Sequence, residues 1–258
     1  MRIRANTTAL VMITALGVLV GVSALFASHS WGGYHWARTS NPFTIKTGDN
    51  VDANWDAYLD EAIVDWNVSA SLDLAKVTGG ANPKNCRPTS GRIEACNANY
   101  GANGWLGIAQ VWVSGTHITQ ATVKLNDTYF NTATYNKPEW RRLVMCQEIG
   151  HDFGLDHQDV TFTNPNLGTC MDYTNSPLGP PSNEHPNQHD YDEIDTIYAH
   201  TDSTTTIGLA TGPGAAASQI DRGQFGQLVR STNSGRTELY VLDLGGGQKI
   251  FTHVIWAN

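Results

Sequence analysis

The chain has 258 residues, which is enough for one sizeable hydrophobic core and an appendage. Its apolar content of 40% is typical of a folded globular protein and argues against a disordered one. Its formal net charge of −8 argues against nucleic acid as a partner, because the phosphate backbone rewards basic surfaces.

Residues 1–30 are predicted to be an export signal. Arg2 and Arg4 give a positive start, an uncharged and mostly apolar run covers 9–27, and the small residues of 28–30 suit cleavage. The apolar run is close to the ~20 residues that span a bilayer, so a retained N-terminal membrane anchor is the alternative to a cleaved signal peptide. Either way, we expect the protein outside the cell or at its surface.

The four cysteines are an even set in a protein expected to be exported, so two disulfides are predicted. Buried free thiols are the alternative, and they would suit a cytosolic protein better. Two of the cysteines, Cys86 and Cys96, lie in a stretch rich in Gly, Asn and Pro over 79–104, which we expect to be a long loop.

Hydrophobic spacing predicts the elements in chain order after an extended arm over 31–50. Apolar residues three or four apart predict helices, and short β-prone or alternating runs predict strands. Pro138 suits the first turn of a helix, and Gly154 suits its end. Helices are expected over Val51–Trp66, Pro138–Phe153 and Asp190–Tyr198, and strands over Leu72–Val77, Leu106–Val113, Gln120–Leu125, Leu228–Arg230, Thr237–Leu242 and Ile250–Trp256.

The expected organisation is one α+β domain with a C-terminal addition. Residues 31–200 would form the main domain. Residues 201–222 are rich in Thr, Gly and Ala and are predicted to be a linker. Residues 223–258 would form a small β-strand segment.

The chemistry is expected in the run Gln147-Glu148-Ile149-Gly150-His151-Asp152-Phe153-Gly154-Leu155-Asp156-His157. Residues four apart share a helix face, so Gln147 and His151 would point the same way, with Glu148 beside them. Gly154 would let the chain turn back and bring His157 to the same point. Three ligands and an open position are typical of a catalytic zinc site. Glu148 could then move protons as a general base and acid.

This run resembles the extended zinc signature of the metzincin metallopeptidases, H-E-x-x-H-x-x-G-x-x-H. Gln147 replaces the first histidine, as in the similar Gln-Glu-x-x-His start of the gametolysin group. The resemblance implies one catalytic zinc held by Gln147, His151 and His157. Because an amide oxygen is a weaker zinc ligand than imidazole, another transition metal is a second option.

The resemblance extends over roughly residues 43–200. Cys170-Met171-Asp172-Tyr173 looks like the methionine turn that lies beneath the metal in metzincins, with Met171 in the structural role. Tyr173 matches a tyrosine that ligates the metal in astacin-like members, and it could stabilise the oxyanion. Segments like those of Cys146 and Cys170 lie close together in metzincins, which implies that these two cysteines pair and that Cys86 pairs with Cys96. The resemblance also implies a mixed twisted sheet, long helices and an active-site helix.

The resulting prediction is a monomeric, zinc-dependent metalloendopeptidase acting on proteins or peptides. Its strand Leu106–Val113 would be the sheet edge that pairs with an extended substrate. One rival is a catalytically silent binding protein on the same scaffold, which Gln147 favours. Another makes the C-terminal strands an attachment or carbohydrate-binding module with Tyr240 and Trp256 as platforms. Four other histidines are expected at the surface: His117, His185, His189 and His200. As an alternative, His185 or His189 could replace Gln147 as a metal ligand.

Overall fold

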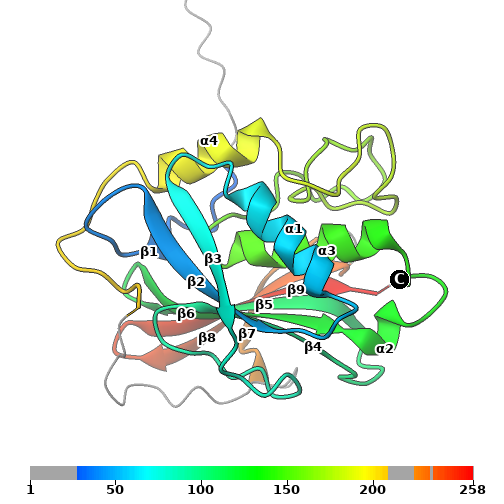
Figure 1. Ribbon diagram of the computed structural model, residues 1–258, viewed down its shortest axis with the longest axis horizontal. Helices are drawn as coiled ribbons and strands as arrows, with labels where there is room; N and C mark the ends of the chain where they lie inside the picture. The colour runs from blue at the N-terminus through cyan, green and yellow to red at the C-terminus, as the bar shows by residue number, and fades with distance from the viewer. Residues whose placement is uncertain (1–27, 209–223, 233–234, 258) are drawn as a thin grey trace, which may run out of the picture.

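The computed structural model describes residues 28–208, 224–232 and 235–257 (Figure 1). The export segment over 1–27 and the linker over 209–222 therefore lie outside the described residues. The first part of the expected linker is described, and it packs on the main domain: the backbone N–H groups of Asp202 and Thr206 donate to the carbonyl oxygens of Arg38 and Ala37. Among the described residues, no helix is both long and apolar enough to cross a membrane.

One mixed sheet runs through the described chain, in the strand order β3-β2-β4-β6-β5-β9-β8-β7, with β1 paired to β6 outside this path. The pairs among β2, β3, β4 and β6 are parallel, whereas β5 to β9 pair antiparallel. The strands are β1 His35–Trp36, β2 Phe43–Asn50, β3 Leu72–Thr78, β4 Ile93–Ala98, β5 Trp105–Ser114, β6 His117–Asn126, β7 Gln227–Thr232, β8 Thr237–Gly245 and β9 Gln248–Trp256.

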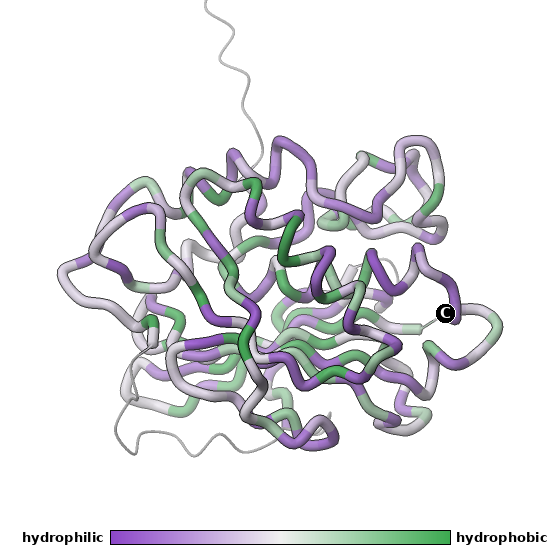
Figure 2. Tube along the Cα trace, in the orientation of Figure 1, coloured by the Kyte–Doolittle hydropathy of each residue, from purple (hydrophilic) through white to green (hydrophobic). Residues whose placement is uncertain are grey.

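The long helices lie on one side of this sheet (Figure 1). They are α1 Asp56–Trp66, α3 Pro138–His151 and α4 Gln188–Ile197, with the short α2 Asp127–Phe130 beside them. Helix α1 buries Leu59, Ile63 and Trp66, which follow its expected apolar spacing. The indole N–H of Trp66 donates to the carbonyl oxygen of Cys146 at 3.1 Å, which ties α1 to α3. Hydrophobic residues gather where these helices meet the strands (Figure 2).

Helix and strand boundaries differ from the expectations at several ends. Helix α1 begins at Asp56 and not at Val51, because Asp52 opens a turn there: its backbone carbonyl accepts from Trp55 and its carboxylate from Asn54. Side chains of this kind favour turns and caps over helix interiors. Helix α3 ends at His151, two residues before the expected Phe153.

Three strands occupy segments for which no strand was expected. The predicted arm over 31–50 contains β1 and β2, and the predicted loop over 79–104 contains β4. Strand β4 carries Glu94, Ala95 and Asn97, which have poor strand propensity, so its sequence gives little local signal. Its pairing with β2 and β6 overrides that propensity. The buried Glu94 carboxylate accepts hydrogen bonds from Asn50, Thr89 and Arg92.

The expected sheet edge over Leu106–Val113 is not an edge. These residues belong to β5, which has β6 on one side and β9 on the other. The C-terminal strands β7–β9 therefore extend the main sheet. On the face away from the helices, Trp256 packs in a buried cluster with Trp105, Ile108 and Trp112, and Tyr240 packs against this cluster. Trp256 is only 7% exposed, so it is not a surface platform.

Candidate active site

The last turns of α3 present three buried polar side chains. Pro138 opens the helix at its first turn, and Gln147, Glu148 and His151 are each 0% exposed near its end. The chain then reverses at Gly154, whose φ of +111° is a conformation that favours glycine. A Cβ there would also lie 2.5 Å from the carbonyl oxygen of Tyr34. The reversal brings the following residues back toward the helix end.

The two histidines of the motif lie together. The ring centroids of His151 and His157 are 4.7 Å apart in an edge-on arrangement. Nδ1 of His151 lies 2.8 Å from the carbonyl oxygen of Leu155. A carbonyl only accepts, so Nδ1 carries the hydrogen and Nε2 is left with its lone pair. Among the described residues that Nε2 has no hydrogen-bond partner, and neither has Nε2 of His157.

Gln147 is oriented as an oxygen ligand would be. Its amide Nε2 donates to the carbonyl oxygen of Cys170 at 2.6 Å, which assigns the other amide atom as oxygen. That oxygen is buried and has no hydrogen-bond partner in the described part of the chain. The contact also sets Gln147 against the segment that carries Met171.

Glu148 faces the backbone of β5. A Cβ on Gly107 would lie 2.5 Å from the Glu148 Oε1 atom, so glycine at this position makes room for the carboxylate. Neither carboxylate oxygen completes a hydrogen bond with a described residue. Burial raises the pKa of Glu148 well above its ordinary value, and the backbone N–H of Ala109 only partly opposes this rise.

The Met171 segment lies beneath the helix end. A Cβ on Gly150 would lie 2.7 Å from the Met171 sulfur, so the thioether packs directly on the helix backbone. Cys146 is bonded to Cys170, and Cys86 to Cys96, which is the predicted pairing. The first bridge fixes the helix to the segment below it, one residue before Gln147 and one before Met171.

Tyr173 also lies at this site. Its ring centroid is 6.2 Å from that of His157, and its side chain is buried. The hydroxyl donates to the carbonyl oxygen of Arg236 at 3.1 Å and lies 3.4 Å from that of Trp256. Burial raises the pKa of this hydroxyl above its ordinary value, so it stays a donor.

The ionisable side chains around the site have shifted pKa values, with different causes at His151 and at Asp156. Burial lowers the pKa of His151 well below its ordinary value, and the neighbouring His253 and His157 lower it further. Burial alone would raise the pKa of Asp156, but hydrogen bonds with His157 and Arg230 bring it well below its ordinary value. The Arg230 guanidinium approaches both oxygens of Asp156 at 2.5 Å. Arg230 and Asp156 therefore form a charge-assisted ion pair at the rim of the site.

His253 is a site residue that sequence reasoning missed. Its ring stacks on that of His151, with centroids 4.1 Å apart and planes 14° from parallel. It is 2% exposed, and its Nε2 has no hydrogen-bond partner among the described residues. His253 lies in β9, far along the chain from the motif that ends at His157. Only the pairing of β9 with β5 brings it here, and no local pattern signals that pairing.

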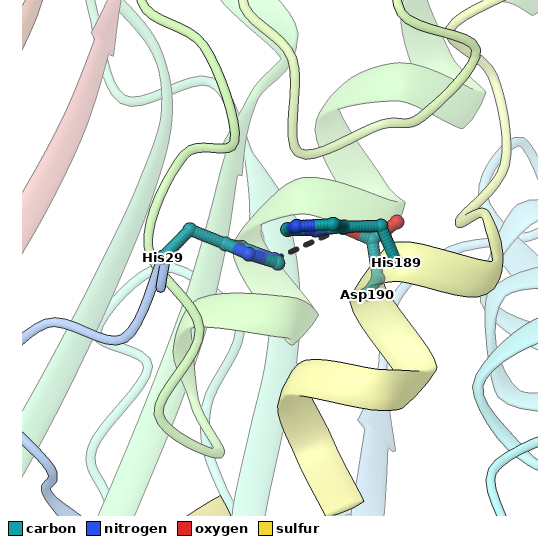
Figure 3. A group of neighbouring side chains, drawn as sticks. All are labelled: His29, His189 and Asp190. Carbon is teal, nitrogen blue, oxygen red and sulfur yellow. Dashed lines mark hydrogen bonds and ion pairs between the residues drawn. The ribbon is translucent and has the colours of Figure 1, made fainter. Parts of the chain in front are cut away.

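The two alternative ligand histidines lie elsewhere. Nδ1 of His185 is 2.8 Å from Asp65 on α1, and His185 is exposed. His189 stacks on His29 at 4.8 Å, and His29 Nε2 lies 3.1 Å from Asp190 (Figure 3). Asp190 also accepts a hydrogen bond from the Thr169 hydroxyl. The contacts among His29, His189 and Asp190 therefore tie the chain near residue 29 to the start of α4.

Comparison with known proteins gives no family. No protein-family model matches the chain, and no curated protein matches it. Several solved structures resemble parts of it, among them the following two. Myroilysin is 13% identical, with a TM-score of 0.37 over 64% of this chain and 97% of that one. High choriolytic enzyme 1, a hatching-enzyme zinc-protease from Oryzias latipes (medaka fish), is 10% identical, with a TM-score of 0.33 over 64% of this chain and 94% of that one. These values are too low to decide function, which must be argued from the site itself.

Proposed function

We propose that this chain is a metzincin-type, zinc-dependent metalloendopeptidase, with Gln147, His151 and His157 as metal ligands. The observation that carries the proposal is a set of buried ligand atoms that have no hydrogen-bond partner in the described part of the chain: Gln147 Oε1, His151 Nε2 and His157 Nε2. A buried polar atom without a hydrogen bond costs roughly 1–3 kcal/mol, so leaving three of them unsatisfied is unfavourable. A cation with open coordination positions accepts all three, and the nitrogen and oxygen donors suit zinc.

The neighbouring contacts support the same set. Each metal-binding histidine usually donates its other N–H to a fixed acceptor, and His151 does so to the Leu155 carbonyl. Gln147 is held through its Nε2 by the Cys170 carbonyl. Zinc would supply a Lewis acid that polarises the scissile carbonyl and lowers the pKa of water toward ~7.

The chain's own residues would move the proton and stabilise the developing charge. The Glu148 carboxylate would accept a proton from the attacking water and deliver it to the departing amine, which breaks the peptide bond. The Tyr173 hydroxyl would donate to the oxyanion once it is free of the Arg236 carbonyl. Peptides or proteins are therefore the proposed substrates, and one zinc ion per chain the proposed cofactor.

The proposed location is extracellular or at the cell surface. The two disulfides suit an oxidising compartment, and they support export of the protein. A retained membrane anchor and a monomeric state both stay predictions from the sequence. A catalytically silent binding protein is the rival proposal. The space that Gly107 leaves for Glu148 argues against it, because a silent site needs no buried carboxylate beside the metal.

Metal analysis of the purified full chain tests the proposal. We expect about one zinc ion per chain, and loss of that ion in the His151→Ala/His157→Ala double variant. Glu148→Gln keeps the size and neighbours of the side chain, so it should retain the metal while peptide cleavage falls by about 10²–10⁴-fold. A casein-type cleavage assay with and without chelator completes the test. Undiminished metal in the double variant would reject the ligand set, and near-normal cleavage by Glu148→Gln would reject the base.

A further inference from the structure

We propose that the C-terminal strands are a built-in inhibitor that occupies the substrate edge of β5 and covers the catalytic site. This inference rests on the proposed function. The inhibitory segment is defined as β7, β8 and β9, and its central member is β9, Gln248–Trp256.

The first argument is backbone pairing. Strand β9 runs antiparallel to β5 along nearly its whole length, with pairs from Trp105↔Trp256 to Ser114↔Gln248. An extended peptide that added to this sheet would need the same row of β5 backbone N–H and C=O groups. One strand edge cannot pair with two partners, so β9 and a substrate compete for it.

The second argument is register. The β5 residue opposite His253 is Ala109, two residues beyond Gly107, whose backbone lies against the Glu148 carboxylate. The pairing therefore places His253 level with the proposed base, where the residues beside a scissile bond would lie. The stacking of His253 on His151 follows from this register. Together with His157, Arg230, Thr237 and Glu238, His253 lines one small cleft at the site.

The third argument is that the inhibitory segment engages the site's own groups. The Tyr173 hydroxyl donates to the Arg236 carbonyl in the β7–β8 connection. Arg230 of β7 ion-pairs with Asp156, the residue before His157. The oxyanion donor and the turn that carries a metal ligand are thus both held by the segment.

The fourth argument concerns how β9 is attached. Alternate residues of β9 face opposite sides of the sheet. Phe251 and Ile255 join the main core on the helix side, beside His253. Ile250, Val254 and Trp256 join the smaller cluster on the other side. Val254 therefore stabilises the docked strand without touching any proposed catalytic residue, which makes it the position to test.

The test uses the zinc-loaded full chain and a fluorescent peptide hydroxamate, a short extended peptide with a metal-chelating end. Val254→Ala removes buried contacts from β9. Its control, Val229→Ala, makes the same change on β7 at a side chain that is 52% exposed. If β9 must leave before the probe binds, apparent affinity scales with the open fraction. We expect Val254→Ala to bind the probe at least about tenfold more tightly, and Val229→Ala to match the parent.

A second measurement follows the strand itself by hydrogen exchange with mass spectrometry. Probe binding should speed amide exchange across residues 248–256 of the parent protein while β5 stays protected. Probe bound with β9 still protected, or equal affinity in the two valine variants, would overturn the inhibitory role and leave the metallopeptidase proposal standing. Absence of zinc from the parent protein would overturn both. Should Val254→Ala fail to fold, the exchange experiment on the parent still decides.

Discussion

The side-chain amide of Gln147 donates to the carbonyl oxygen of Cys170 at 2.6 Å, so its amide oxygen is turned away from that carbonyl and has no hydrogen-bond partner among the described residues. This contact fixes the orientation of the Gln147 side chain, at the position where the metzincin signature has a histidine. The Cys170 carbonyl provides the acceptor that an imidazole N–H would also need.

Gln147→His should therefore bind zinc more tightly. An imidazole nitrogen is a better donor to zinc than a neutral amide oxygen, and its second N–H can donate to the Cys170 carbonyl. Activity is expected to change in either direction, because an amide ligand would leave the metal a stronger Lewis acid. Competition against a zinc chelator measures the affinity of both forms. Equal zinc affinity in the two forms would mean that Gln147 is not a ligand.

Gly107→Ala should damage both stability and catalysis. The new Cβ would lie 2.5 Å from Glu148 Oε1 and 2.5 Å from a Val144 methyl, so Glu148 must move. Overpacking of this kind costs about 1–3 kcal/mol of unfolding free energy. Denaturant unfolding and peptide cleavage check the two effects. Ser114→Ala, at an exposed position on the same strand, is the control and should change neither. Full cleavage activity in Gly107→Ala would contradict the proposed role of Glu148.

Cys146→Ala/Cys170→Ala should destabilise the protein and loosen the site. The bridge closes a loop with a sequence separation of 24, worth about 3 kcal/mol in the chain-entropy model. Because the bridge fixes the helix to the segment under the proposed metal site, zinc affinity should fall as well. The matched control is Cys86→Ala/Cys96→Ala, which removes a bridge with a separation of 10 and should leave zinc affinity unchanged. Equal zinc loss in both variants would show that the bridges act only through general stability.

Asp202 should contribute stability that is lost in acid. Burial alone would raise its pKa, but the backbone N–H of Arg38 and the side chain of His35 bring the pKa below its ordinary value. The groups facing it are Arg38, His35, His117 and His200. A carboxyl with a lowered folded-state pKa stabilises above its unfolded pKa of about 3.9, and this contribution disappears as pH falls through the folded pKa.

The check for this is Asp202→Asn, compared with the parent by thermal unfolding across the acid range. The variant should be less stable at neutral pH, and the difference should shrink below about pH 4. Asp73→Asn is the control, because Asp73 makes no ion pair with the described residues. A stability difference that stays constant down to strong acid would contradict the assignment.

The features that depend on residues close together in the sequence could be predicted from it. Helix α3 follows from Pro138 and its apolar spacing, and the convergence of His151 and His157 follows from a helix that is broken at Gly154. Strands β2 and β4 escaped prediction because their pairing partners, and not their own residues, decide their conformation. His253 escaped for the same reason: its neighbours are set by sheet order, and no sequence spacing records that order.

The pairing of β5 with β9 also has a consequence for biogenesis. The Gln110–Thr252 contact between these strands joins residues 142 positions apart, so β9 is synthesised long after β5. Contacts this distant in sequence form late, because the chain must first lose the conformational entropy of closing a long loop. Until then the nascent chain presents β5 as an unpaired edge, the feature that most invites strand-to-strand aggregation. A chain that stays unfolded until export is complete avoids this hazard, since both strands then arrive together.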